Sequence, residues 1–283
     1  MNSIGTIALL TLREAVRRRI VAACAAITIG LVCLSAWGFD RLSHNAGITS
    51  GEVNAAIPQA LILFMFMFSF VVALSASAMA APAVSAEVES GVLLSVLARP
   101  IRRSEVLLGK WLGLATVIFA YSAIVSGLEV GVVDWVSGFV PPNPIVVGLY
   151  LFAEGAILLT LTLLLSTRLS AIATGVVAIA LFGAAWLAGV VGSLGTTFKI
   201  SSLKTIGEVA RYILPTDGLS RGAIYYLEPQ SFVTQRLAES QSGGGGNPFF
   251  ALAPPTWAYL IWVCVWFLAI LSAGLVSFER REL

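Results

Sequence analysis

The sequence has little charge. Asp, Glu, Lys and Arg make up 11% of the 283 residues, whereas hydrophobic types make up 58%; soluble domains usually carry about a quarter charged residues. A water-soluble fold of this length could not hide so much apolar surface. The composition therefore excludes an ordinary soluble enzyme or binding domain and favours a membrane protein, whose apolar side chains can face lipid.

Histidine and cysteine are also scarce. His44 is the one histidine and has no Cys or Asp cluster beside it in the sequence, so we expect no metal site and no resident cofactor. Cys24, Cys33 and Cys264 lie in apolar runs, which predicts packing roles rather than disulfide bonds. The net charge of +2 is too small to indicate a nucleic-acid partner. We expect no cleavable signal peptide, because the first apolar run is too long for one.

Six long apolar runs are present. A helix needs about 20 mostly apolar residues to cross the hydrocarbon of a bilayer. The predicted spans cover residues 20–39, 57–84, 106–133, 145–167, 171–191 and 257–278. This pattern predicts an all-α polytopic membrane protein with one transmembrane domain over residues 1–283. Two connections, residues 40–56 and 192–256, are long and polar, and the glycine run at 243–246 is typical of a flexible linker.

Lysine and arginine are distributed unevenly about these spans. Eleven lie at the N-terminus, in the connection 85–105 together with Lys110 just after it, at Arg168 and at the C-terminus, whereas six lie in the opposite connections. Basic residues concentrate in cytoplasmic loops. We therefore predict a multi-pass protein of the cytoplasmic (inner) membrane with both termini in the cytoplasm. Residues 192–256 are then an extracytoplasmic segment.

Residues 3–19 precede the first span and have an amphipathic pattern. An apolar stripe at helical spacing is formed by Ile4, Ile7, Ala8, Thr11 and Ala15. Arg13, Arg17 and Arg18 lie largely off that stripe. Basic amphipathic helices bind the surface of anionic bilayers, so we predict an interfacial helix. The alternative is that these residues only extend the first span into water.

Residues 85–105 connect the second and third spans and contain an apolar helical stripe within residues 92–97. Pro100 ends this predicted helix at Arg99, because proline disfavours helical geometry in the residue before it. Ser104 is a candidate cap for the third span. The stripe either docks into a groove on a cytoplasmic partner or packs on the inner rim of the bundle. The pattern alone leaves both alternatives open.

Two acidic residues fall inside predicted spans, and Asp134 directly follows one of them. Glu154 lies about 15 Å along a helix from Pro144, near the bilayer middle. Burying a charge there costs about 2.5–3.5 kcal/mol, so Glu154 should face the bundle. It then either lines a substrate path or is a hydrogen-bonded structural group. Glu129 and Asp134 fall near the outer interface, and we predict solvated roles for both.

The segment 192–256 contains two predicted short amphipathic helices at the outer surface or dipping into it. The first has apolar residues at i, i+3, i+4 and i+7 from Ile206 to Ile213, and Pro215 ends it. Thr216 or Asp217 could cap the second. If the second helix is a simple surface helix, Asp217 would form only a local i,i+4 ion pair with Arg221.

Two further patterns concern packing. Gly109 and Gly113 have the small-xxx-small spacing that permits close contact between helices. The aromatic and methionine run over residues 64–70 predicts packed core or lipid contact rather than a ligand site.

Taken in order, several segments resemble the type-2 ABC exporter permeases. The resemblance is carried by AEVESGVLLSVLARPIRRSEVLLGKWLG at residues 86–113, by LLTLREAVRRRI at residues 9–20 and by FERREL at residues 278–283. The segment YILPTDGLSRGAIYYL at residues 212–227 is similar to the branch that includes the nitrous-oxide-reductase maturation permease. The glycine run and Pro254-Pro255 have no counterpart in this resemblance.

The resemblance implies a permease subunit that is not itself an enzyme. Such permeases pair as homodimers or heterodimers on two ATPase subunits, which bind ATP and Mg²⁺. The implied ATPase-coupling residues are Glu87, Glu89, Gly91, Arg99, Pro100 and Arg102. The implied outer gate includes Asp217 and Arg221. The sequence agrees in having no G-x-x-x-x-G-K-[ST] phosphate loop, since Trp111 follows Gly109-Lys110.

The favoured function is therefore an ATP-driven exporter permease that moves an amphipathic or lipid-like substrate, because the spans are rich in apolar side chains and poor in charge. One alternative is the permease of a copper or sulfur cofactor-maturation system. Another is an ion-coupled secondary transporter, although residues 1–140 and 141–283 show no internal repeat. A membrane enzyme is disfavoured, because the chain has one histidine and no H-E-x-x-H motif.

Overall fold

A computed structural model of the chain describes residues 3–44, 50–91, 102–229, 232–234, 237–238, 249–251 and 253–281. Within these residues the chain forms helices and no β-strand. Six helical segments in them are long and apolar enough to cross a membrane. The predicted all-α polytopic fold, with its six spans, is confirmed.

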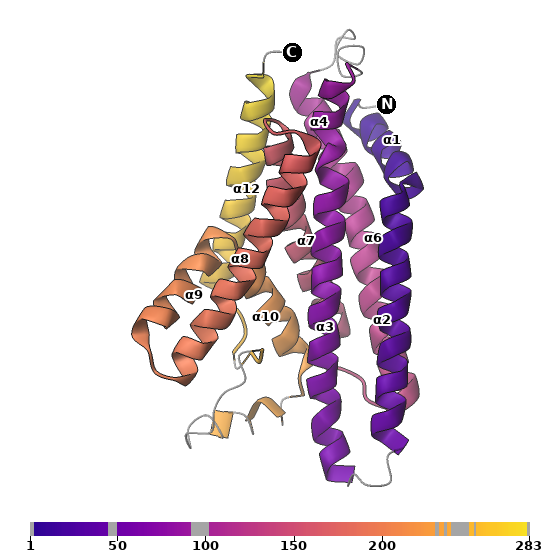
Figure 1. Cartoon of the computed structure of the whole chain (residues 1–283), viewed down its shortest axis with the longest axis vertical. Coiled ribbons are helices and arrows are strands. Elements are labelled where there is room, and N and C mark those ends of the chain that lie inside the picture. Colours follow the sequence, from indigo (N-terminus) through magenta and orange to yellow (C-terminus); the bar gives the residue numbers. More distant parts are fainter. Residues whose placement is uncertain are drawn as a thin grey trace.

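The spanning helices pass alternately up and down the long axis of the molecule (Figure 1). They are α2 (Arg19–His44), α3 (Ser50–Ala80) followed directly by α4 (Pro82–Glu89), α6 (Arg103–Ser137), α7 (Pro144–Ser166), α8 (Ala171–Thr197) and α12 (Trp257–Glu279). The short helix α1 (Ser3–Arg17) precedes them. Two more short helices, α9 (Ser201–Ile213) and α10 (Thr216–Leu227), lie between α8 and α12. Both chain ends lie at the same end of the bundle, as predicted (Figure 1).

Local sequence explains several helix ends. Pro144 occupies the first turn of α7, where a missing N–H costs nothing. Ser170 caps α8 and Thr256 caps α12 with their side-chain oxygens. The predicted cap at Ser104 is wrong, because α6 begins one residue earlier and no side chain caps it. The predicted cap of α10 at Thr216 or Asp217 is also wrong. The N-cap residue of α10 is Pro215, and no side chain caps the helix.

The close contact predicted at the two glycines of α6 is confirmed, and its partner is α1. A Cβ atom added to Gly109 would lie 2.7 Å from the Cβ of Ile7, and one added to Gly113 would lie 2.6 Å from the carbonyl oxygen of Ala8. The apolar stripe of α1 therefore packs on α6 rather than on a bilayer surface, which corrects the prediction for that face. Leu10, on another face, is exposed.

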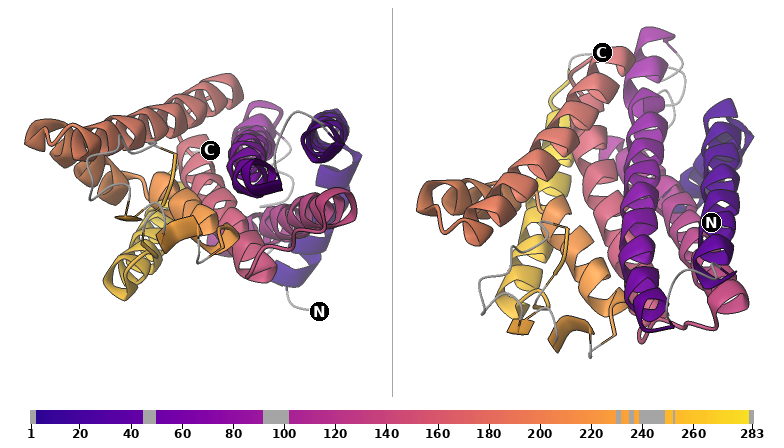
Figure 2. Two further views of the ribbon diagram at one scale, coloured as in Figure 1. Left: turned by 90° about the horizontal axis from the view of Figure 1, so that it is seen from below. Right: turned by 60° about the horizontal axis from the view of Figure 1, so that its bottom comes forward.

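The aromatic run of α3 is packed core, one of the two predicted outcomes. The Phe70 ring lies 5.0 Å from that of Phe182 and 5.5 Å from that of Trp186, both on α8. Phe66 also meets the Trp186 ring at 5.2 Å. These edge-on and tilted contacts join α3 to α8 across the bundle. Figure 2 shows α3 and α7 at the centre of the helices when the bundle is seen along its axis.

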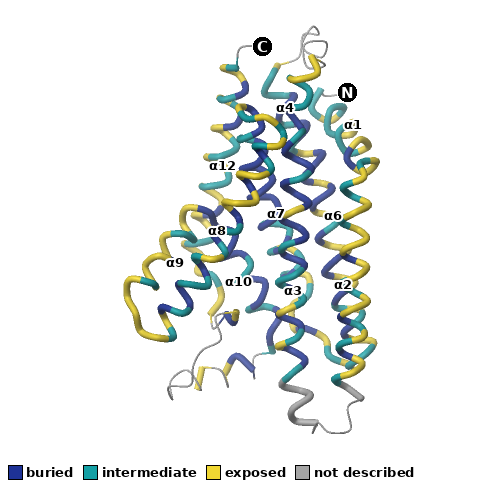
Figure 3. The backbone as a smooth tube through the Cα atoms, in the orientation of Figure 1, coloured by how far each residue is buried: buried dark blue, intermediate teal, exposed yellow. Residues whose placement is uncertain are grey.

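Helices α8 and α9 form a hairpin that leans away from the bundle (Figures 1 and 2). α8 continues to Thr197, six residues beyond its predicted end, because Gly192 allows α9 to approach closely. A Cβ atom on Gly192 would lie 2.7 Å from the Cα of Gly207. The outer side of α9 is exposed, and it includes Ile206 and Ile213 (Figure 3).

Helix α10 is not the simple surface helix considered from the sequence. Most of its residues are buried, from Thr216 to Leu227, and it packs on α7, α8 and α3 (Figure 3). Tyr226 stacks on Tyr150 of α7 with ring centroids 5.8 Å apart. The chain therefore returns into the bundle before α12 begins, which agrees with the expectation that this segment dips inward.

Candidate functional site

The end of the bundle that holds both termini contains a buried lysine. Lys110 lies on α6 with its side chain 7% exposed. Its Nζ forms an ion pair with the Glu87 carboxylate and donates a hydrogen bond to the Ala83 carbonyl oxygen, both on α4. A buried charge requires such partners, because desolvation otherwise disfavours it. Glu87, predicted to face another protein, is thus engaged inside the chain, whereas Glu89 is exposed.

A second ion pair lies beside the first. Glu14 of α1 and Arg18, the residue that directly follows α1, are paired at 2.5 Å. Together with Glu87 and Lys110 they line a cavity of about 20 Å³ beneath α1. Three helices, α1, α4 and α6, therefore meet around four charged groups of alternating sign. We call Glu14, Arg18, Glu87 and Lys110 the inner charge cluster.

The described chain turns at the end of α4, next to this cluster. Gly91 has φ +71°, a left-handed conformation that glycine adopts without strain at the end of a helix. Its N–H donates to the Val88 carbonyl oxygen at 3.1 Å. Arg102 is exposed at the start of α6. Arg99, Pro100 and the apolar stripe predicted within residues 92–97 lie outside the described residues.

Three arginines tie the ends of α6, α7 and α12 together at the same end of the bundle. Arg281 Nη1 donates to the Thr167 carbonyl oxygen at 2.6 Å, and Arg103 Nη1 donates to the Arg281 carbonyl oxygen at 2.5 Å. Arg168 Nε donates to Ser277 Oγ at 2.9 Å. Carbonyls at helix C-termini lack partners within the helix, and cations there are stabilised by the helix dipole.

The sequence interpretation missed these roles, because it counted the arginines only as charges that orient the chain. The available signal was the position of Arg168 and Arg281 within a few residues of helix C-termini, where basic side chains commonly bond the last carbonyls. Arg103 begins α6 and offered no such signal.

The acidic residues inside the spans are buried to different extents. Glu154 of α7 is 2% exposed, and both of its carboxylate oxygens lie 2.7 Å from Ser69 Oγ of α3. It therefore faces the bundle, as predicted. The solvated role predicted for Glu129 is wrong, since it is buried and accepts a hydrogen bond from Ser35 of α2 at 3.0 Å. Asp134 is exposed, as predicted.

Asp217 lies at the centre of an outer charge cluster, which we define as Asp217, Arg211 and Arg221. The Nε atoms of Arg211 and Arg221 lie 2.8 Å and 3.0 Å from the same oxygen, Oδ2. Arg221 also donates to Ser193 Oγ at 2.6 Å and to the Gly189 carbonyl oxygen at 3.1 Å. A Cβ atom on Gly189 would overlap the Asp217 carboxylate. The predicted pair is present, but Arg211 was missed because it lies on the preceding helix.

Side chains of α12 hold the turn between α9 and α10. Tyr259 Oη donates a hydrogen bond to the Pro215 carbonyl oxygen at 3.1 Å. Trp262 Nε1 donates to the Tyr212 carbonyl oxygen at 3.1 Å, and Trp266 Nε1 donates to the Ile213 carbonyl oxygen at 2.8 Å. Two of these acceptors are carbonyls of the last turn of α9, which have no partner within the helix. The outer charge cluster is therefore fixed to three neighbouring helices.

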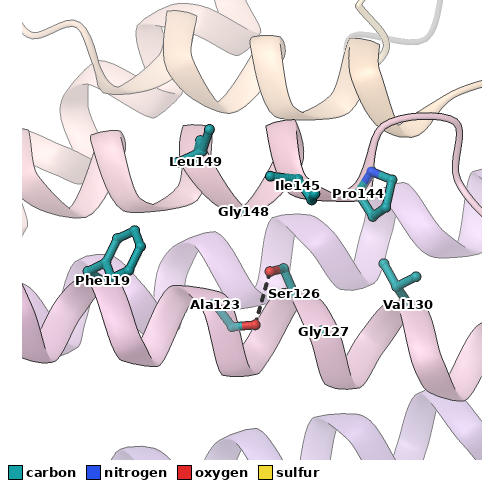
Figure 4. Close-up of a pocket in the computed structure, with 9 residues that line it drawn as sticks. All are labelled: Phe119, Ala123, Ser126, Gly127, Val130, Pro144, Ile145, Gly148 and Leu149. Carbon is teal, nitrogen blue, oxygen red and sulfur yellow. Dashed lines mark hydrogen bonds between the residues drawn. The ribbon is translucent and has the colours of Figure 1, made fainter.

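An apolar groove of about 270 Å³ lies between α6 and α7 (Figure 4). Its walls include Phe119, Ile145 and Leu149. The one hydroxyl in its lining, that of Ser126, donates to the Ala123 carbonyl oxygen at 3.3 Å (Figure 4). The groove can therefore hold apolar groups, but its lining supplies no acid, base or nucleophile poised for catalysis.

The described residues contain no group of three or more His, Cys, Asp or Glu side chains placed to hold a metal ion. A family model described as ABC-2 family transporter protein matches residues 6–283. The match runs from the first turn of α1 to the end of the chain, and so includes both charge clusters. No curated protein matches the chain.

Proposed function

Because the chain belongs to the ABC-2 family of transporter proteins, we propose that it is the permease subunit of an ATP-driven exporter whose ATPase subunits are separate chains. The six spans and the buried polar clusters between them support a transport role. ATP and Mg²⁺ bind to the ATPase subunits in this proposal. The permease converts their movement into opening of a path through the bundle.

The ATPase docks on the segment between α4 and α6. The observation that carries this assignment is the inner charge cluster, because α4 ends beside it and α6 starts beside it. Glu89, Gly91 and Arg102 lie where the segment leaves and rejoins the bundle, and Glu89 and Arg102 are exposed there. Arg99 and Pro100, within the segment, complete the proposed docking surface.

Glu87 has a different part in coupling. Its bond to Lys110 joins the end of α4 to α6 and, through the cavity below α1, to Glu14 and Arg18. A shift of the docked segment therefore reaches three helices at once. We assign Glu87 to transmission within the permease rather than to contact with the ATPase.

The outer charge cluster forms the outer gate. Asp217 and Arg221 lie on α10, which is packed among spanning helices, and their partners lie on α8 and α9. Separation of α8 from α10 would break the bonds of Arg221 to Gly189 and Ser193 together. Glu154, buried on α7, lies within the bundle beside this path.

Two copies of the permease sit on two ATPase subunits in the cytoplasmic membrane, with the inner charge cluster on the cytoplasmic side. The concentration of arginines at that end supports this orientation. The substrate is amphipathic or lipid-like, as the apolar spans suggest. The similarity of residues 212–227 to the cofactor-maturation branch supports a copper- or sulfur-related cargo as the second candidate.

Charge reversal tests the docking surface. The permease is co-expressed with a candidate ABC ATPase and purified through a tag on the permease. Glu89→Lys combined with Arg102→Glu should abolish co-purification, whereas Asp134→Lys, an exposed acid at the opposite end, should leave the complex intact. A complex that survives the double reversal would exclude this surface as the docking site.

A further inference from the structure

The outer charge cluster has one more positive than negative charge. Two guanidinium groups share a single oxygen of Asp217. Among the residues that the structure describes, Asp217 is the one acid paired with either arginine. Of the other acids, Glu208 pairs with Lys204 at 3.6 Å, and Glu154 accepts its hydrogen bonds from Ser69. The ion pairs of the cluster itself therefore contain one more positive charge than its single carboxylate offsets.

The two arginines differ in how far their donors are used. Arg221 donates through all three of its guanidinium nitrogens. Nε donates to Asp217, and Nη1 donates to the Phe250 carbonyl oxygen. Nη2 donates to the Gly189 carbonyl oxygen and to Ser193 Oγ. Arg211 bonds within the described part of the chain only through Nε. Its side chain is 30% exposed, whereas that of Arg221 is 17% exposed. The terminal nitrogens of Arg211 are therefore open to a ligand.

The cluster lies at the depth of the spanning helices. Gly189, which contacts Asp217 and Arg221, is about 27 Å along α8 from its first residue. Trp262 and Trp266, which hold the adjoining turn, are about 8–14 Å along α12 from its first residue. Measured from these helix ends, the cluster lies toward the outer interface, where water or an anion can meet a charge held between helices, and charged groups packed within spanning bundles commonly mark substrate paths.

The helix geometry also favours an anion. α10 begins at this cluster, so the positive end of its dipole points toward it. Discontinuous helices in transporters often direct such ends at anionic groups of a substrate. The guanidinium group presents paired N–H donors that match two oxygens of a phosphate or carboxylate.

We propose that Arg211, supported by Arg221, binds the anionic group of an amphiphile at the α9–α10 turn. This inference rests on the proposed function and names the substrate class, an anionic lipid-like molecule. The exposed side chains next to Arg211 on α9, Tyr212 and Ile213, are apolar or aromatic. A molecule that carries both charge and hydrocarbon fits these surroundings better than a free anion does.

The test compares lipid binding by the full-length chain and its variants. Each protein is purified in detergent, titrated with phosphatidylglycerol or phosphatidylcholine, and analysed by native mass spectrometry for bound lipid. Arg211→Gln should weaken phosphatidylglycerol binding by about tenfold, since it removes a charge-assisted hydrogen bond. Lys199→Gln, which removes one exposed cation just before the same helix and leaves the Lys204–Glu208 pair intact, should bind like the wild type.

A second variant has the opposite expectation. Asp217→Asn raises the local positive charge and should strengthen phosphatidylglycerol binding, with thermal unfolding in phosphatidylcholine nanodiscs as a check on folding. Equal binding by Arg211→Gln and the wild type, or equal losses in Arg211→Gln and Lys199→Gln, would overturn the proposal. Competition by inorganic phosphate at equal concentration would also overturn it, because the site would then bind a free anion.

The result is separable from the proposed function. Arg211→Gln should still co-purify with the ATPase, because it lies far from the docking surface. Failure of the wild type to bind any ATPase would remove the exporter assignment and leave the lipid measurement unchanged.

Discussion

Lys110 of α6 and Glu87 of α4 form a buried ion pair beneath α1. This pair places a charged contact at the point where α4 gives way to the proposed docking segment. The pair therefore links the proposed docking segment, through the end of α4, to helices α6 and α1.

We expect Lys110→Met to destabilise the permease by about 1–3 kcal/mol, because Glu87 loses its partner while its side chain keeps some solvent contact. Thermal unfolding in detergent measures the loss. The double variant Lys110→Met/Glu87→Gln should recover part of it, since no unpaired charge remains. Simple addition of the two single effects would show that the residues do not interact.

Glycine packing gives a matched pair of substitutions on α6. Gly113→Ala should lower the unfolding free energy by about 1–3 kcal/mol, because the new Cβ would lie 2.6 Å from the backbone oxygen of Ala8. Gly131→Ala should have little effect, as no atom lies within 4 Å of its added Cβ. Similar unfolding temperatures for the two variants would contradict the close packing of α1 on α6.

The C-terminal arginines have unequal roles despite equal charge. Arg281→Ala should destabilise the bundle by about 1–2 kcal/mol, because the α7 carbonyl at Thr167 loses its donor. Arg280→Ala removes the same charge from an exposed position and should change stability by less than about 0.5 kcal/mol. If the two variants unfolded at the same temperature, the bonds made by Arg281 would not be stabilising.

Two substitutions at Glu154 distinguish a structural role of its carboxylate from a functional one. Glu154→Gln keeps an oxygen that can accept the Ser69 hydrogen bond, so we expect near-wild-type stability and transport. Glu154→Leu strands the Ser69 hydroxyl and should cost about 1–3 kcal/mol. Transport activity in reconstituted vesicles is the measurement, and a large loss in the glutamine variant would instead make the carboxylate a functional group of the path.

The spans were predictable because hydropathy over about 20 residues measures the requirement that a bilayer imposes. The end of α8 was not, since Gly192 favours a break in isolation and becomes a packing site only when α9 lies against it. Lys110 lies near the start of the third predicted span, where lysine side chains normally reach toward water. Its burial depends on α1 and α4, which no local pattern places beside it.

The acidic residues illustrate the same limit. Distance along a helix gave the depth of Glu154 and Glu129, but depth does not identify the neighbour that covers a side chain. Ser35 covers Glu129 from a helix far away in sequence. Asp217 and Arg221 were indicated by the resemblance of residues 212–227 and by their i,i+4 spacing, whereas Arg211 required the turn at Pro215 to be known.

Site-specific cross-linking to the ATPase tests the central claim most directly. After replacement of the three native cysteines, a single cysteine is placed at Glu89 or, as a control, at Asp134, and the complex is treated with a cysteine-to-lysine cross-linker. The account predicts a permease–ATPase adduct from Glu89→Cys and none from Asp134→Cys. An adduct formed only from Asp134→Cys would place the ATPase at the opposite end and contradict the account.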